Sequence, residues 1–182
     1  MLTRTAVILI LTAAAARAES VPAPPIHTYS EWSRETLSRL PTDIPKVRIV
    51  LHHTAYPVSA ADKKLTGTAG WRASVVHARR AQFLHRHIHG WKDIGYHFMI
   101  DWEGRIWQGR RVEKKGASVQ SFNNGTIGVA LFGNFENQHP RPEQMRALKR
   151  WLAYLVYAYK IPPTSIFGHH QFNSTQCPGR NL

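Results

Sequence analysis

The sequence predicts a single α/β domain with a central, mostly mixed β-sheet flanked by helices. Apolar runs of strand length alternate with segments of helical periodicity, and there is no internal repeat. A chain of 182 residues can bury one sizeable core and leaves little room for a second. The domain is expected over residues 46–182, with residues 19–45, rich in proline and polar residues, as an N-terminal arm laid over it.

Strands are predicted where apolar residues run almost without interruption. Residues 47–51 are broken only by Arg48, which suits a strand covered on both faces. Residues 126–132 form a second such run, and Ile166-Phe167 forms a short one. Residues 96–102 and 105–108 flank Glu103-Gly104, a strong hairpin signal.

Two helices are predicted from apolar spacing. Residues 71–87 form the first, which ends at Gly90. Residues 142–159 form the second and clearer one, because Pro142 suits a first turn and Pro162 prevents continuation. The loops at 56–70 and 113–125 are polar. In such sheets, sites gather where loops leave the strand ends, so His52 and His169 are expected to share one.

The first 18 residues predict a secretory signal. Arg4 gives a positive start, residues 6–16 are apolar, and Ala16-Arg17-Ala18 matches a cleavage site. The alternative is an uncleaved anchor, although the apolar stretch is short for a membrane span and no other segment could cross a bilayer. We therefore expect an exported protein, periplasmic or secreted, without a stable membrane span after cleavage.

The charge of the chain predicts affinity for polyanions. The formal net charge is +13 and the sequence pI is near 10.5. Anionic cell-wall polymer, acidic lipid headgroups and nucleic acid would all qualify, and a merely solvated basic face is the plain alternative. The predicted export disfavours nucleic acid as the partner.

Cys177 is the single cysteine and cannot form an internal disulfide. A free thiol without a function is prone to oxidation in an oxidising compartment, whereas a thiolate is a strong zinc ligand. His169 lies eight residues before it, and the pair His52-His53 could supply a third ligand. Strand alternation lets only one of that pair face a metal but does not say which. The alternative is that Cys177 is a small buried hydrophobe.

Ordered motifs along the chain resemble the zinc amidase family that includes peptidoglycan recognition proteins and the short phage amidases called lysozymes. The resemblance extends from about residue 30 to residue 179. Its specificity comes from the ordered set rather than from any one piece. The matching stretches are Val-Leu-His-His-Thr-Ala at 50–55, Trp-Lys-Asp-Ile-Gly-Tyr-His-Phe at 91–98, Gly-Arg-Ile-Trp-Gln-Gly-Arg at 104–110, Thr-Ile-Gly-Val-Ala-Leu-Phe-Gly-Asn at 126–134, Gly-His-His at 168–170 and Thr-Gln-Cys-Pro-Gly at 175–179.

The resemblance implies hydrolysis of the amide between N-acetylmuramic acid and L-alanine in peptidoglycan. It implies a Zn²⁺ cofactor held by His52, His169 and Cys177, and catalytic roles for Tyr96 and Thr175. Three protein ligands leave a fourth position open, as in catalytic zinc sites, where bound water becomes acidic. The phenol of Tyr96 could donate a hydrogen bond to the water or to the oxyanion. The alternative is that Tyr96 is an ordinary aromatic strand residue.

Two departures from the family pattern concern the groove. Ala130 stands where cytoplasmic recycling relatives have a glutamate base, which favours the tyrosine-assisted branch. Ser118 follows a Gly-Ala pair where relatives often carry a substrate-binding histidine.

Other polar residues complete the set of candidates. The candidate substrate contacts are His53, Arg110, Arg111, Ser118 and Asn123, with packing or solvated surface as the alternatives. His85 and His89, four residues apart, could share a helix face and a second metal, or could be a solvated helix end. The expected partner is peptidoglycan or a muropeptide, and the chain is expected to be monomeric. The rival hypothesis is a recognition module that binds cell wall without cutting it.

Overall fold

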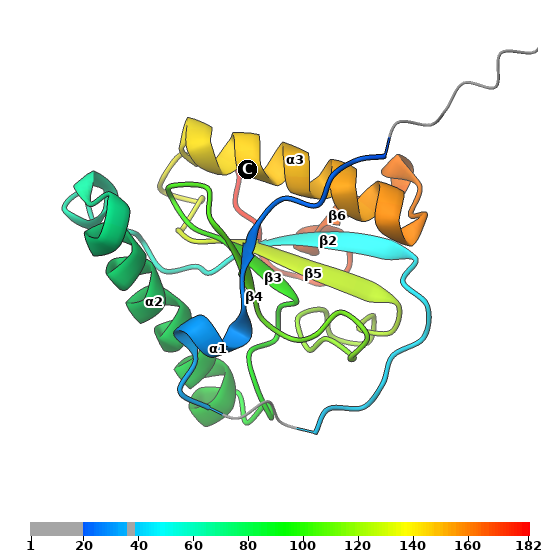
Figure 1. Cartoon of the computed structure of the whole chain (residues 1–182). Helices are drawn as coiled ribbons and strands as arrows, with labels where there is room; N and C mark the ends of the chain where they lie inside the picture. Colours follow the sequence, from blue (N-terminus) through cyan, green and yellow to red (C-terminus); the bar gives the residue numbers. More distant parts are fainter. Residues whose placement is uncertain (1–19, 36–38) are drawn as a thin grey trace, which may run out of the picture.

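A computed structural model describes residues 20–35 and 39–182 (Figure 1). The predicted signal segment, residues 1–18, lies outside the described residues. Within them, no helix is both long enough and apolar enough to cross a bilayer.

A six-stranded mixed sheet forms the centre of the molecule, as predicted. Its order is β1-β4-β3-β5-β2-β6, and β3 and β4 are its antiparallel neighbours while the other pairs are parallel. The strands are β1 (Ile26–His27), β2 (Arg48–His53), β3 (Phe98–Ile100), β4 (Ile106–Gln108), β5 (Thr126–Leu131) and β6 (Ile166–Gly168).

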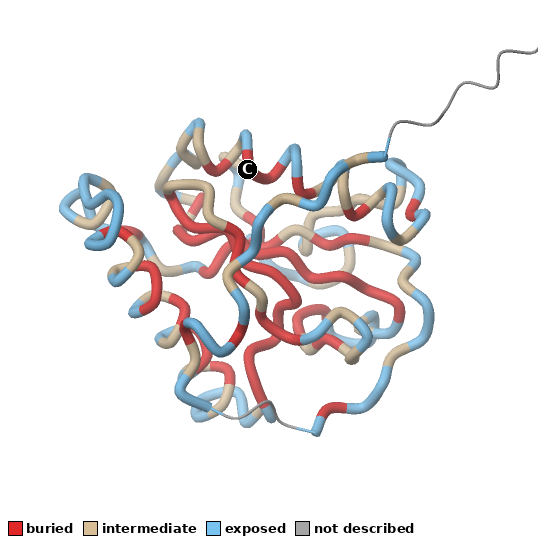
Figure 2. The backbone as a smooth tube through the Cα atoms, viewed as in Figure 1, coloured by how far each residue is buried: buried red, intermediate tan, exposed pale blue. Residues whose placement is uncertain are grey.

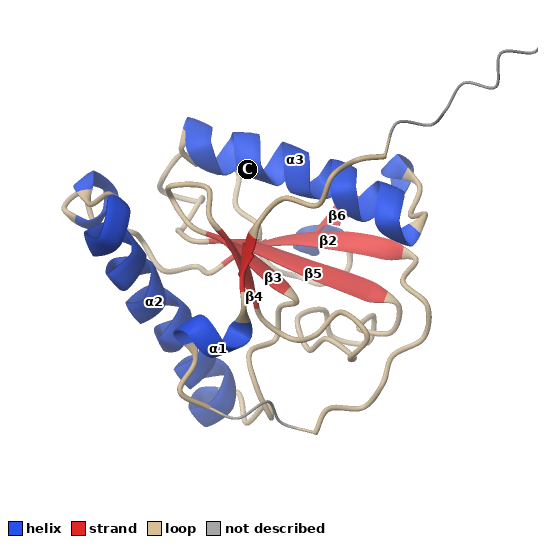
Figure 3. Ribbon diagram, in the orientation of Figure 1, coloured by secondary structure: helices blue, strands red, loops and turns tan. Residues whose placement is uncertain are grey.

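Helices cover both faces of this sheet (Figures 1 and 3). α2 (Gly67–Phe83) lies on one side and α3 (Pro142–Tyr159) on the other. α2 continues into a π-helical turn, η2 (Leu84–Ile88). The shorter helices are α1 (Tyr29–Trp32) and the 3₁₀ turns η1 (Asp62–Lys64), η3 (Pro163–Ser165) and η4 (His169–Gln171).

The α3 side of the sheet is packed with apolar side chains. Strand residues on this face, such as Ile49, Ile127 and Val129, are fully buried. They pack against Leu148 and Leu155 of α3, whose apolar positions recur with the helical period. Figure 2 shows the buried interior of the strands and the inward stripe of the helix.

The α2 side of the sheet mixes apolar and polar groups. Met99 and Trp107 pack there against Val75 and Ala78 of α2. Asp101 is also buried, and its carboxylate accepts from the Ser74 hydroxyl at 2.7 Å. Buried polar groups are tolerated here because they have hydrogen-bond partners.

Most predicted elements are confirmed, with shifted ends. The hairpin forms around Gly104, whose φ of +81° favours glycine. The strand predicted at 47–51 extends to His53, so that both histidines lie within β2. The first helix begins at Gly67 rather than at residue 71, because tertiary packing buries Gly70.

The region predicted as an arm is more structured than expected. β1 adds a parallel edge strand beside β4, and α1 follows it directly. Trp32 of α1 is fully buried, and its indole N–H donates to the Gln108 carbonyl at 2.7 Å. This segment therefore closes one end of the core.

Candidate metal centre and groove

The pleat of β2 separates the two adjacent histidines. His52 pairs in register with Ala130 of β5, which belongs to the core on the α2 side. His53 points to the α3 side, where its Nδ1 accepts from the Phe135 backbone N–H at 3.2 Å. Successive side chains of a strand point to opposite faces, so only His52 faces the site.

Strand pairing brings His169 and Cys177 to His52. β6 runs parallel to β2, and His169 follows β6 directly. The loop after it folds back, because the His170 N–H donates to the Cys177 carbonyl at 2.8 Å. The donor atoms of His52, His169 and Cys177 all lie within 4.8 Å of one another.

The three donors fit a zinc ion. Tetrahedral ligands at bond lengths of about 2.1 Å (nitrogen) and 2.3 Å (sulfur) stand about 3.6 Å apart. The His52 Nδ1 and the Cys177 Sγ are separated by 3.5 Å. The other ring nitrogen of His52, Nε2, is buried without a hydrogen-bond partner among the described residues. No other group of three such ligating side chains occurs within residues 20–35 and 39–182.

The two imidazoles are in the protonation state that metal binding requires, whereas the thiol must lose its proton. Burial lowers the pKa of His52 well below its ordinary value and lowers that of His169, so both imidazoles are neutral at pH 7. Burial raises the pKa of the Cys177 thiol to about 12. A bound cation would therefore displace one proton, from the thiol.

Asn173 orients His169, a contact that sequence reasoning missed. Its side-chain Oδ1 accepts from His169 Nε2 at 3.0 Å, and its amide nitrogen donates to the Gln120 carbonyl at 3.3 Å. The bond places the ring proton on Nε2 and leaves Nδ1 as the lone-pair nitrogen. A lone asparagine in a polar loop gives no sequence signal of this role.

A groove runs past the three donors. One cavity of about 570 Å³ contains His52, His169 and Cys177 in its lining, and a second, of about 460 Å³, adjoins it. The two share the lining residues Trp91, Ser118, His169 and Thr175. The donors thus lie along a continuous open depression that could accept an extended polymer.

Tyr96 lies in the same cavity as the donors. Its ring is 5.2 Å from that of His52, and its hydroxyl donates to the His53 carbonyl at 3.4 Å. Burial, and next the proximity of Cys177, raise the pKa of Tyr96 well above its usual value. The phenol therefore stays protonated, and its single O–H could exchange the long bond to the His53 carbonyl for a closer acceptor.

Four other predicted residues line the groove. Thr175 borders both cavities, and its hydroxyl oxygen accepts from the Cys177 N–H at 3.2 Å. Ser118 borders both as well, and Asn123 borders the second. His53 borders the first, although its ring nitrogen Nδ1 is engaged with the backbone of Phe135.

The two arginines expected near the groove lie elsewhere. Arg110 is buried, and its guanidinium donates to the carbonyls of Asp93 and Lys115 at 3.2 and 2.6 Å. It braces the backbone that carries Tyr96 and lines neither cavity. Arg111 is exposed and pairs with Glu113 outside both cavities.

His85 is a structural residue rather than part of a solvated helix end. It is 8 % exposed, and its Nδ1 accepts from the Gly95 N–H at 2.9 Å, directly before Tyr96. Its ring also contacts Trp91, and Trp91 stacks on His89 with centroids 5.0 Å apart. These rings make one wall of the groove, and none of them belongs to a group of three ligating side chains.

A mixed α/β sheet with a His-His-Cys donor set beside an open groove defines the chain as a candidate metal-binding α/β domain. The profile of the family described as N-acetylmuramoyl-L-alanine amidase (Amidase_2) matches residues 43–180, and the chain belongs to this family. The resemblance inferred from the motifs is confirmed.

Relatives of both kinds, recognition proteins and amidases, are similar to the chain. Peptidoglycan-recognition protein SD of Drosophila simulans is 32 % identical over 87 % of this chain and 82 % of its own length. An N-acetylmuramoyl-L-alanine amidase of Sus scrofa is 30 % identical over 87 % of this chain but 26 % of its own length. The solved amidase LysC of Clostridium intestinale is 27 % identical with a TM-score of 0.71, covering 88 % of this chain and 92 % of that one.

Proposed function

We propose that this protein is a zinc-dependent N-acetylmuramoyl-L-alanine amidase that acts on peptidoglycan after export. The observation that carries the proposal is the meeting of His52, His169 and Cys177 in an open groove that also contains Tyr96. A zinc bound by three side chains retains an open coordination position, which is typical of catalytic rather than structural sites.

The zinc would be held by His52, His169 and Cys177 and would supply Lewis acidity at the scissile amide. The groove binds the peptide stem and glycan along the walls that meet at His169. Tyr96, a protonated phenol, donates a hydrogen bond to the oxygen that becomes negatively charged when the amide carbonyl is attacked. Thr175 offers a second hydroxyl in the same groove, with Ser118 and Asn123 along the stem.

Asn173 and His53 support the metal ligands through hydrogen bonds. Asn173 fixes the ring of His169, and the His53 backbone N–H donates to the Cys177 sulfur at 3.4 Å. Such outer contacts orient metal ligands and tune their basicity.

The rival candidate is a recognition module that binds cell wall without cleaving it. It is favoured by the similarity to a recognition protein at 32 % identity. The presence of the cysteine supports the enzyme, because without a third ligand the two imidazoles would hold zinc poorly.

Mass spectrometry of purified cell wall after digestion distinguishes the two. We expect release of free peptide stems beginning with L-alanine, loss of this release with a chelator, and its return with Zn²⁺. Wall that sediments with the protein and stays uncut at full zinc occupancy would establish the recognition module instead. Digestion of both lysine-type and diaminopimelate-type wall would identify the preferred stem. The same preparation, run on a sizing column, tests the expected monomer.

A further inference from the structure

The outer face of α2 combines exposed apolar side chains with arginines. Val76 is 66 % exposed and Phe83 is 56 % exposed. Arg72 and Arg80 are exposed on the same helix, spaced from them by three or four residues, which places all four on one stripe. Residues 65–92 contain no aspartate or glutamate, so no acid of this segment offsets the charge.

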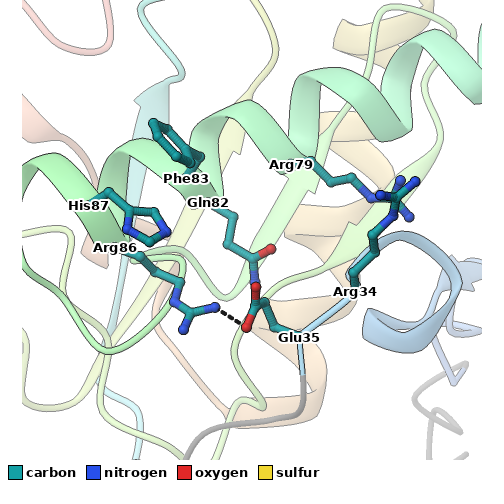
Figure 4. A pocket seen from close by; sticks show the side chains of 7 residues that line it. All are labelled: Arg34, Glu35, Arg79, Gln82, Phe83, Arg86 and His87. Atoms are coloured by element: carbon teal, nitrogen blue, oxygen red, sulfur yellow. Dashed lines mark ion pairs between the residues drawn. The ribbon is translucent and has the colours of Figure 1, made fainter.

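A small cavity lies at the edge of this stripe (Figure 4). It measures about 160 Å³ and lies between α2 and the segment that follows α1. Arg34 and Arg79 both line this cavity, and Figure 4 shows them at one end of it and the ion pair of Arg86 with Glu35 at the other. Phe83 borders the cavity beside them.

Arg34 and Arg79 have no acidic partner among the described residues. Arg79 is held by a 2.5 Å hydrogen bond from its Nε to the Trp32 carbonyl. Within the described residues, no carboxylate pairs with Arg34 or Arg79. Burial, and next the positive charge of Arg34, lower the pKa of Arg79. Two guanidinium groups that line one small cavity repel each other, and an oxyanion between them would relieve that repulsion through paired N–H donors.

We propose that the outer face of α2 docks on an anionic phospholipid bilayer, with a headgroup phosphate between Arg34 and Arg79 and with Val76 and Phe83 in the interfacial layer. Arginines provide attraction to anionic headgroups, and apolar side chains among them gain free energy only in a medium with an apolar layer. A hydrated phosphate polymer would satisfy the arginines but would leave Phe83 in water. The bilayer is therefore the occupant that accounts for both features.

Docking there is compatible with an accessible groove. Ala81, Leu84 and His85 of the same helical segment line the cavity beside the metal donors, on the side away from Val76 and Phe83. The bound protein would present its groove laterally, next to the membrane surface. This surface is distinct from the groove, and the inference does not rest on the proposed amidase activity.

Vesicle flotation with the full chain tests the proposal. The vesicles contain phosphatidylcholine alone or with about a third phosphatidylglycerol. The charge variant is Arg34→Gln with Arg72→Gln, and its matched control is Lys149→Gln with Arg150→Gln, an exposed pair on α3. The apolar variant is Val76→Ser with Phe83→Ser. Since all these side chains are exposed, circular dichroism should show intact folding for each variant.

We expect binding only to the anionic vesicles. The Arg34/Arg72 variant should partition about 30-fold more weakly, from about 1 kcal/mol per basic residue at the surface. The Val76/Phe83 variant should partition at least about 10-fold more weakly at unchanged charge. The Lys149/Arg150 control should change by less than about threefold.

Three results would each overturn the proposal: equal binding to neutral vesicles, equal loss in the α3 control, or unchanged binding of the apolar variant. Soluble polyphosphate serves as the competing ligand. If polyphosphate binds the wild type and the apolar variant equally and more tightly than vesicles do, the surface serves a phosphate polymer and not a membrane.

Discussion

The two faces of the central sheet are built from the same strands but differ in chemistry. On the α3 face, Ile49, Ile127 and Leu155 make an apolar core. On the α2 face, the same strands contribute His52 and Ala130, and the covering layer contains the buried polar groups Ser74 and His85. The alternation of strand side chains thus separates a face that stabilises the fold from a face that carries the site.

The difference shows where change is tolerated. Removing atoms from the apolar face lowers the free energy of unfolding and leaves the groove geometry in place. Altering the α2 face changes metal binding and hydrogen bonding while the α3 core holds the chain folded. Mutations on each face can therefore test whether stability and metal binding are separated in this way.

The largest effect is expected from Cys177→Ala. Loss of the sulfur removes one of three donors, so zinc binding and cleavage should both be abolished while the thermal midpoint of the metal-free protein changes little. Zinc content by elemental analysis and stem release from cell wall are the measurements. His170→Ala, an exposed neighbour of His169, is the control and should retain both. Full activity in the Cys177→Ala variant would contradict the zinc hypothesis.

Tyr96→Phe should retain zinc and lose turnover. If the phenol donates to the developing oxyanion or takes part in proton transfer, kcat should fall by about 10²–10⁴. Tyr56→Phe is a matched control because it removes the hydroxyl of another tyrosine that lines the same cavity. Steady-state kinetics on a soluble muropeptide measures both, and normal turnover in the Tyr96 variant would remove Tyr96 from the mechanism.

Leu155→Ala tests the apolar face. Leu155 is fully buried against the sheet, so the free energy of unfolding should fall by about 2–5 kcal/mol. Zinc content and kcat per folded molecule should be unchanged. Urea denaturation monitored by tryptophan fluorescence measures the loss. Tyr157→Ala, at a half-exposed position on the same helix, should cost less than about 0.5 kcal/mol.

The smallest effect concerns pH and the histidines on the α2 side. Burial lowers the pKa of His77 to about 4, while its unfolded pKa is about 6.5. The unfolded chain then binds the proton more readily, so this contribution to stability is present above pH 6.5 and is lost as pH falls toward 4.

His77→Gln should therefore flatten the decline of stability between pH 6.5 and 5 by up to about 2 kcal/mol. Urea titrations at three pH values measure the slope. His87→Gln, an exposed histidine on η2, should leave the slope unchanged. If the free energy of unfolding of both variants falls with decreasing pH as it does in the wild type, burial of His77 does not contribute to acid sensitivity.

Motif order and local pattern predicted much of this molecule. The two apolar strands, the hairpin around Gly104 and the helix from Pro142 were predicted because each depends on near neighbours in the chain. The candidate ligands followed from residue types and from a family resemblance that the family match confirms. The expected metal group is brought together, and its role in catalysis stays a prediction.

Long-range packing decided what the sequence could not. Nothing local distinguishes Arg110 from Arg111, yet one is buried under backbone carbonyls and the other lies in solvent. Part of the predicted arm forms a strand and a helix because the side chain of Trp32 is buried in the core.

The sequence alone determined which residues could hold a metal, because thiol and imidazole chemistry belongs to the residue types. Tertiary structure alone decided that His52 and not His53 faces the site, since the choice depends on the register of β2 against β5. It likewise placed Asn173 on His169 and the arginines of α2 beside Arg34, because contacts between distant segments exist only once the sheet has formed.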